Sequence, residues 1–132
     1  MKILFLTFYF EPDLCAGSFR NTPLFRELLQ QMDEKDWIHV ITTQPNRYHS
    51  FHVEGQAREI SDNYRIDRIR VPEHKRGFID QVRSFRVFYN EALRLAGKER
   101  YDLVYASSSR LFTAFFGRRI AGKQRIPLYL DI

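Results

Sequence analysis

Hydrophobic residues along the chain form two kinds of pattern, short continuous runs and longer stretches at helical spacing. The first run, Lys2–Phe8, is apolar at nearly every position, as is typical of a strand buried on both faces of a parallel sheet. The stretch Pro23–Met32 has apolar residues three and four positions apart, which predicts a helix. Thr22 and Pro23 suit an N-cap and a first helical residue, although the helix could also begin earlier, near Ser18.

The remaining patterns continue the alternation of strands and helices. Strands are predicted for Trp37–Gln44, Tyr64–Pro72, Tyr101–Ser109 and Ile126–Ile132, and helices for Gly77–Lys98, regular from Asp80, and for Arg110–Gly122. Apolar and polar residues alternate in Tyr64–Pro72 with one slip of register, which indicates an edge strand with a solvated face. The polar segment Pro45–Tyr64 carries no prediction of a strand or helix.

Each of the two later helices has a stripe of residues that we expect to face the sheet. In the first helix the stripe is Phe78, Val82, Phe85, Tyr89, Ala92 and Ala96, with Gly97 as the expected C-cap. In the second it is Phe112, Phe115, Phe116 and Ile120.

Apolar strands alternating with helices predict an α/β fold. We expect a Rossmann-like, mostly parallel, doubly wound sheet of about five strands with helices on both faces, formed by residues 1–132 as a single domain. The last predicted strand, Ile126–Ile132, stops where the chain stops. We therefore expect this domain to be truncated at its C-terminus.

Composition narrows the classes of function. The chain has 132 residues, one cysteine and a formal net charge of +5, so a disulfide is excluded and a reducing cytoplasm is favoured. A basic balance suits phosphates or anionic lipid, but the basic residues are dispersed and form no nucleic-acid-reading motif. The four histidines show no metal-ligand spacing, and no apolar run reaches the roughly 20 residues of a membrane span.

The connection Phe8–Gly17 is longer and chemically more mixed than a simple strand-to-helix link needs. It follows the first strand, at the sheet edge where ligands bind in open α/β folds. Gly17 would let a ligand approach the backbone, Arg20 could clamp an anion, and the helix N-terminus adds free amides. We therefore predict an anion or sugar site here, with two alternatives: Gly17 as only a turn residue and Arg20 as only a solvated helix residue.

Three common fingerprints are absent from the sequence. There is no GxGxxG after the first strand, no GxxxxGK[ST] and no GxSxG, which argues against the usual dinucleotide, P-loop and α/β-hydrolase sites.

Four segments, in order and at similar spacing, resemble family 4 glycosyltransferases of the GT-B fold. They are "MKILFLTFYFEPDLCAGSFRNTPLFRELLQQM", "HVITTQPNRY", "RIDRIRVPEHKRG" and "YDLVYASSSRLFTAFFGRRIAGKQRIPLYLDI". The resemblance covers nearly the whole chain and implies the N-terminal, acceptor-side domain of such an enzyme. The C-terminal domain of the family, which holds most of the nucleotide-sugar site, has no counterpart here.

The resemblance implies transfer of a sugar, with retention of configuration, from a nucleotide-sugar donor to a glycan or lipid-linked acceptor, as in polysaccharide biosynthesis. It implies no metal and no other cofactor. By position, Ala16 and Gly17 would approach the donor phosphates, Ser108 and Asp131 would line the cleft, and Asn46 and Tyr48 would lie on the acceptor side. The histidine that many relatives carry after the fourth or fifth strand is missing, so no catalytic residue is assigned. Without the donor half, we expect this chain alone to be inactive.

Membrane contact is a further expectation from the resemblance, on the cytoplasmic face. Within Arg76–Tyr89, the candidate surface for an anionic membrane is Arg76, Phe78, Arg83, Phe85, Arg86, Phe88 and Tyr89. The alternative is that Val82, Phe85 and Tyr89 simply pack on the sheet.

A rival interpretation is a non-enzymatic binding module with a flavodoxin-like or receiver-like sheet. It accounts for the size and strand pattern, but only Glu11 and Asp13 follow the first strand, and a receiver needs a fuller acidic cluster.

Overall fold

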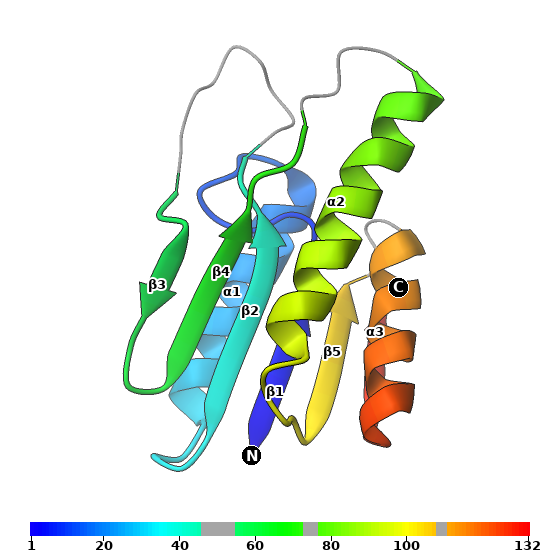
Figure 1. Cartoon of the computed structure of the whole chain (residues 1–132). Coiled ribbons are helices and arrows are strands. Elements are labelled where there is room, and N and C mark those ends of the chain that lie inside the picture. The colour runs from blue at the N-terminus through cyan, green and yellow to red at the C-terminus, as the bar shows by residue number, and fades with distance from the viewer. Residues whose placement is uncertain (46–54, 73–76, 108–110) are drawn as a thin grey trace.

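The computed structural model describes residues 1–45, 55–72, 77–107 and 111–132 (Figure 1). The elements in these ranges are β1 (Lys2–Leu6), α1 (Ala16–Gln31), β2 (Trp37–Thr43), β3 (Arg58–Ile60), β4 (Tyr64–Ile69), α2 (Phe78–Ala96), β5 (Leu103–Ser107), α3 (Leu111–Gln124) and β6 (Leu128–Asp131). The predicted positions of Asn46, Tyr48, Arg76 and Ser108 fall outside the described residues.

The strands form one six-stranded sheet in the order β3-β4-β2-β1-β5-β6. Every neighbouring pair is parallel except β3 with β4. In Figure 1, α1 lies behind the sheet, whereas α2 and α3 lie in front of it. This arrangement confirms the predicted doubly wound, Rossmann-like α/β fold. Counted alone, the five parallel strands follow the order 3-2-1-4-5, which is the Rossmann order and differs from the 2-1-3-4-5 order of flavodoxin-like and receiver-like sheets.

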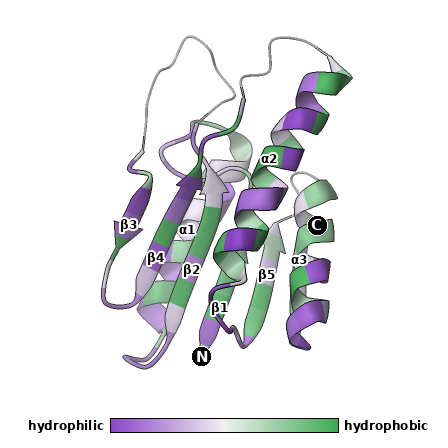
Figure 2. Ribbon diagram, viewed as in Figure 1, coloured by the Kyte–Doolittle hydropathy of each residue, from purple (hydrophilic) through white to green (hydrophobic). Residues whose placement is uncertain are grey.

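Two hydrophobic cores lie on opposite faces of the sheet, and β1 contributes to both. Ile3 and Phe5 point to the α1 face, whereas Leu4 and Leu6 point to the face covered by α2 and α3. This explains the near-continuous apolar run of β1, since both sets of alternate side chains are buried. Figure 2 shows the contrast between the largely hydrophobic β1 and β5 and the more hydrophilic β3.

The prediction of an edge strand at Tyr64–Pro72 is wrong. β4 lies between β2 and β3, and the edge is β3, a three-residue antiparallel strand inside the segment for which no element was predicted. The polar residues of β4 misled the prediction because they are buried in pairs instead of facing water. Asp67 contacts His39 and Arg68 pairs with Glu59.

The predicted start of α1 at Thr22 and Pro23 is also wrong, whereas the alternative of an earlier start, near Ser18, is correct. The helix begins at Ala16, two residues earlier than Ser18, and includes Pro23. The Thr22 hydroxyl instead accepts a hydrogen bond from the backbone N–H of Glu11 at 3.2 Å. It thereby links the helix to the preceding connection. In the sequence, a threonine with this tertiary role cannot be told apart from an N-cap.

The predicted inward stripes of α2 and α3 are correct only in part. Phe85, Ala92 and Ala96 are buried as expected, but Phe78 is 79% exposed and Val82 is 42% exposed. The helix does end at Gly97, whose N–H donates to the carbonyl oxygen of Leu93.

In α3, Phe116 and Ile120 are buried, whereas Phe112 and Phe115 are 46% and 58% exposed. Small residues take the inward positions because α3 packs tightly on β5. A Cβ atom on Gly117 would come within 2.7 Å of the Ala106 side chain. The larger rings therefore turn to the side of the helix that does not face β5.

A buried polar network lies beneath α2, around His39. The ring is fully buried, with Nδ1 at 2.6 Å from the Tyr101 hydroxyl and Nε2 at 2.6 Å from Asp67. Arg58 and Arg65 also donate to Asp67, at 2.8 and 2.7 Å. Hydrogen bonds from His39, Arg58 and Arg65 outweigh burial and hold the pKa of Asp67 far below its usual range. Burial lowers the pKa of His39 despite the neighbouring carboxylate, so the imidazole is neutral in the folded protein.

This network predicts a loss of stability in mild acid. The unfolded chain binds a proton at His39 below about pH 6.5, whereas the folded chain resists it. The free energy of unfolding should therefore fall as the pH drops below 6.5, by at most about 1.4 kcal/mol per pH unit for this one proton. Urea denaturation between pH 7.5 and 5 would measure the slope. The wild type and a His39→Gln variant share all the other histidines, so the difference between their slopes reports on His39. The same slope in both would contradict the assignment of this pH dependence to His39.

Candidate functional site

The candidate site lies at the carboxyl ends of β1 and β5, where the direction of the chain crossovers reverses. These strands are parallel neighbours, with Leu6 opposite Ala106. β1 leads to α1 behind the sheet and β5 leads to α3 in front of it. In open α/β folds the crevice outside such a switch point is where ligands bind.

The connection from β1 to α1 is anchored on both faces of the sheet. The Phe8 ring contacts Phe85 and Phe88, each with centroids 5.4 Å apart, and so belongs to the core under α2. The Phe10 ring contacts Phe25 of α1, also at 5.4 Å. This double anchoring accounts for the length and aromatic content of the segment and fixes where α1 begins.

Asn21 of α1 lies at the centre of the polar groups at the switch point. Its side-chain amide nitrogen is 2.7 Å from the Thr7 hydroxyl, 3.3 Å from the Tyr9 carbonyl oxygen and 3.4 Å from the Ser107 hydroxyl. Thr7 already donates its own hydroxyl hydrogen to Tyr9, so the Asn21 nitrogen must be the atom that faces it.

The Asn21 carbonyl oxygen is left without a hydrogen-bond partner among the described residues, although the side chain is fully buried. An unsatisfied buried acceptor costs about 1–3 kcal/mol. Native proteins keep such groups mainly where a ligand or an ordered water completes them. An enclosed water is one donor that completes such an oxygen in proteins.

Asp131, at the end of β6, bonds two side chains near the switch point. One carboxylate oxygen pairs with Arg20 of α1 and the other accepts a hydrogen bond from the Tyr105 hydroxyl at 2.8 Å. Burial, and then the Asp131 carboxylate, raises the pKa of Tyr105 well above its usual value. Tyr105 therefore stays a neutral donor, and Asp131 fixes the orientation of the half-exposed Arg20.

The N-terminus of α1 points its free amides into the same region. The N-cap residue, Cys15, is in an extended conformation and its side chain makes no capping hydrogen bond, and the first turn carries no acidic residue. The first amides of a helix lack intrahelical acceptors, and their dipoles favour an anion. The α1 N-terminus thus adds a partial positive charge here, while the charge of Arg20 is paired with Asp131.

The structure brings together four of the residues predicted for the site. The first turns of α1 contain Ala16, Gly17 and Arg20, and Arg20 contacts Asp131 of β6. Asn46, Tyr48 and Ser108 lie outside the described residues. Their predicted roles, like those of the other four, stay predictions.

Gly17 has a reason inside the protein to be glycine. A Cβ atom at this position would lie 3.1 Å from both Cβ and Cδ2 of Tyr9, which is closer than ordinary side-chain contact. The tight approach of α1 to the β1–α1 connection therefore accounts for the residue even without a ligand.

Sequence reasoning missed Thr7 and Tyr105, and it assigned no specific site role to Asn21 or Ser107. A signal for Asn21 was present, since Ser18, Asn21 and Phe25 recur at helical spacing on the buried face of α1. A polar side chain in such a stripe needs a partner.

The surface predicted for membrane contact does not form as expected. Phe85 and Phe88 are buried in the core, and Arg76 lies outside the described residues. Phe78 and Ile79, at the start of α2, remain about four-fifths exposed, at 79% and 80%. No helix in the described ranges is long and apolar enough to cross a bilayer. In those same ranges, the His, Cys, Asp and Glu side chains form no group of three that could bind a metal ion.

Comparison with known proteins supports the fold. No protein-family model and no curated protein matches the sequence. Among solved structures, the chain is similar to the C-terminal domain of the PF1911 hydrogenase from Pyrococcus furiosus, with a TM-score of 0.63, 11% identity and coverage of 99% of this chain and 90% of that one. It is also similar to part of a UGT transferase from Siraitia grosvenorii in complex with UDP, with a TM-score of 0.49, 14% identity and coverage of 99% and 27%. At these identities the likenesses concern the fold alone.

The contact between Gly17 and Tyr9 can be tested with a matched pair of helical glycines. Gly122 of α3 has open space where its Cβ would lie, so Gly122→Ala should raise the free energy of unfolding by roughly 0.5–1 kcal/mol. Gly17→Ala should gain less or lose stability, because crowding the Tyr9 side chain costs about 1 kcal/mol or more. Urea denaturation compares the two variants. Equal gains would show that Tyr9 moves aside easily and that packing does not require this glycine.

Proposed function

We propose that this chain is the acceptor-side domain of a glycosyltransferase, which moves a sugar from a nucleotide-sugar donor to a glycan or lipid-linked acceptor. The observation that carries the proposal is Asn21, fully buried at the switch point with a carbonyl oxygen that has no hydrogen-bond partner among the described residues. Because this oxygen is fully buried, a sugar hydroxyl would reach it through an ordered water. The sequence resemblance to family 4 glycosyltransferases supports the same assignment.

The N-terminus of α1 and the Arg20 guanidinium suit the leaving group of such a reaction. Departure of a nucleoside diphosphate leaves negative charge on phosphate oxygens, which backbone amides and arginine stabilise without a metal ion. The Arg20 guanidinium has five N–H donors. Because its hydrogen-bond partner among the described residues is a single carboxylate oxygen of Asp131, several of those donors remain for a phosphate.

Asp131 acts in this proposal as a positioning residue. Both of its oxygens are engaged, one by Arg20 and the other by Tyr105, which holds the guanidinium at the end of β6. We assign no catalytic residue. The rest of the donor site belongs to a second domain in the family that the sequence resembles, so this chain alone is expected to turn over no nucleotide sugar.

The proposal predicts a specific role for Arg20 in the full product of the gene. Arg20→Gln should lower kcat/KM for the nucleotide sugar about 100-fold, because a charge stabilising the leaving phosphate is removed. Arg26 is the matched control, since it lies on the same helix, pairs with Glu11 and is equally exposed at 62% against 60%. Release of nucleoside diphosphate from a panel of nucleotide sugars is the readout. Full activity in a folded Arg20→Gln variant, or no consumption of any nucleotide sugar by the wild type, would disprove the proposal.

Contact with an anionic membrane remains part of the proposal, with a smaller surface than the sequence suggested. The exposed apolar side chains beside Arg83 are Phe78 and Ile79, and each basic residue near an anionic surface adds about 1 kcal/mol. We expect weak co-sedimentation with phosphatidylserine vesicles at low salt and none with neutral vesicles. The Phe78→Ser and Ile79→Ser double variant should lose this binding. Unchanged binding would mean that these two residues do not make the contact.

A further inference from the structure

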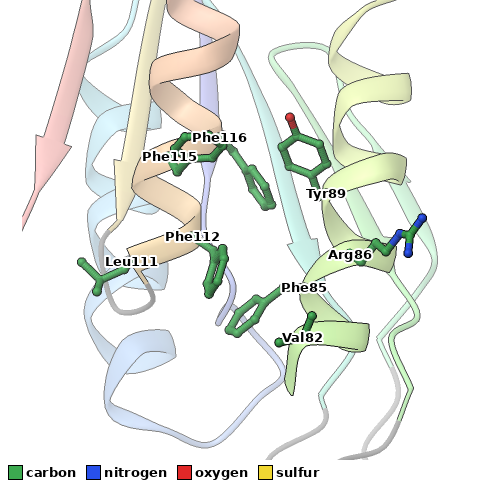
Figure 3. A pocket seen from close by; sticks show the side chains of 8 residues that line it. All are labelled: Val82, Phe85, Arg86, Tyr89, Leu111, Phe112, Phe115 and Phe116. Atoms are coloured by element: carbon green, nitrogen blue, oxygen red, sulfur yellow. The ribbon is translucent and has the colours of Figure 1, made fainter. Parts of the chain in front are cut away.

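An apolar groove lies between α2 and α3. It has a volume of about 580 Å³, within the range of small-molecule sites, and is open to solvent. Its walls are formed by Val82, Phe85, Arg86, Tyr89, Leu111, Phe112, Phe115 and Phe116 (Figure 3). All of these except Arg86 are apolar or aromatic.

The floor of the groove is preformed by aromatic pairs that reach across from the two helices. Phe85 of α2 stacks on Phe112 of α3 with centroids 4.4 Å apart, and Tyr89 packs against Phe116 at 4.3 Å. Figure 3 shows these rings facing one another between the helices. Because Phe85 and Phe116 are also anchored in the core, a ligand would find the floor already ordered.

The rim of the groove leaves apolar side chains in water. Leu111 is 83% exposed, Phe115 is 58% exposed and Val82 is 42% exposed. Covering such surface gains about 25 cal/mol per Å², and a contiguous exposed apolar patch of this kind marks a binding surface. A hydrocarbon chain can follow the groove and cover the rim, whereas a polar molecule would lose hydration there without gaining partners.

The two helices that form the groove carry mostly positive charges. α2 and α3 together carry six basic and two acidic side chains, and of the basic ones Arg86 lines the groove. Arg86 stands at the rim with its guanidinium directed away from the rings (Figure 3). Arg119 lies 5.7 Å from the centre of the Tyr89 ring. A molecule whose chain fills the groove would thus meet cations at its head.

From the apolar walls and the basic rim together, we propose that this groove binds the hydrocarbon chain of an anionic single-chain amphiphile. The chain lies along the aromatic floor and the anionic head lies at the rim beside Arg86. The inference stands on the groove and not on the proposed function. The groove also lies next to the switch-point site, since Phe85 in its wall contacts Phe8 of the connection that leads into that site. Combined with the proposed function, the groove therefore points to a lipid-linked acceptor.

The test uses dodecanoate below its critical micelle concentration, competing with a fluorescent polyene fatty acid and without vesicles. We expect saturable binding, weakened about tenfold by Phe115→Ser, because part of the apolar contact is lost. The matched control is Phe19→Ser, which removes an equally exposed ring, 63% against 58%, from α1 on the other face of the sheet. Leu111→Ser, at the most exposed wall position, gives a second variant if Phe115→Ser does not fold.

The anionic head is tested separately with Arg86→Gln. This variant should weaken dodecanoate several-fold and leave neutral dodecanol unchanged. Arg94→Gln, on the same helix but outside the groove, should change neither.

Three results would overturn the inference. The first is the absence of a specific site. It would be seen as no saturable binding of dodecanoate or dodecanol, or as equal binding by the Phe115→Ser, Leu111→Ser and Phe19→Ser variants. The second is binding to vesicles alone that is lost in Phe115→Ser, which would make the patch a bilayer contact. The third is a dimer in sedimentation analysis that Phe115→Ser abolishes, which would make it an interface between two copies. Each of these outcomes leaves the activity test of Arg20 unaffected.

Discussion

The burial of the β1–α1 connection on both faces of the sheet is the constraint on which the rest of the site depends. Phe8 enters the core under α2 and Phe10 enters the core under α1. The Phe8 carbonyl oxygen accepts a hydrogen bond from the Thr43 hydroxyl at 2.6 Å. With the chain held in this way, Tyr9 packs against Gly17, α1 begins at Ala16, and Asn21 is placed between the ends of β1 and β5.

Two buried polar clusters, around His39 and around Asn21, differ in whether their polar atoms all have hydrogen-bond partners among the described residues. Around His39, both ring nitrogens have partners and Asp67 is bonded by His39 and two arginines. A network satisfied in this way stabilises one packing arrangement. Around Asn21, the amide nitrogen is bonded but the carbonyl oxygen has no partner among the described residues. Of the two clusters, the second is the one with an acceptor left unpartnered among the described residues.

The α2–α3 surface follows from how closely α3 approaches the sheet. Gly117 and Thr113 allow α3 to lie against β5, and the neighbouring Phe112 and Phe115 are turned toward solvent as a result. The same packing that completes one core therefore leaves an aromatic groove beside it. Because its basic surroundings do not interrupt the apolar floor, the groove combines two properties, affinity for hydrocarbon and attraction for an anion.

The sequence by itself determined the fold class, most element positions and the location of the candidate site. Continuous apolar runs specify strands buried on both faces, and an alternation with helices leaves few topologies other than a doubly wound sheet. Only the tertiary structure decided that β4 is internal, that α1 starts before Pro23 and that Phe112 and Phe115 face outward. It also decided that Arg20 meets Asp131 and that the Asn21 carbonyl oxygen has no partner among the described residues. Local periodicity records which residues are apolar, but pairing between residues about 110 positions apart depends on how the elements pack.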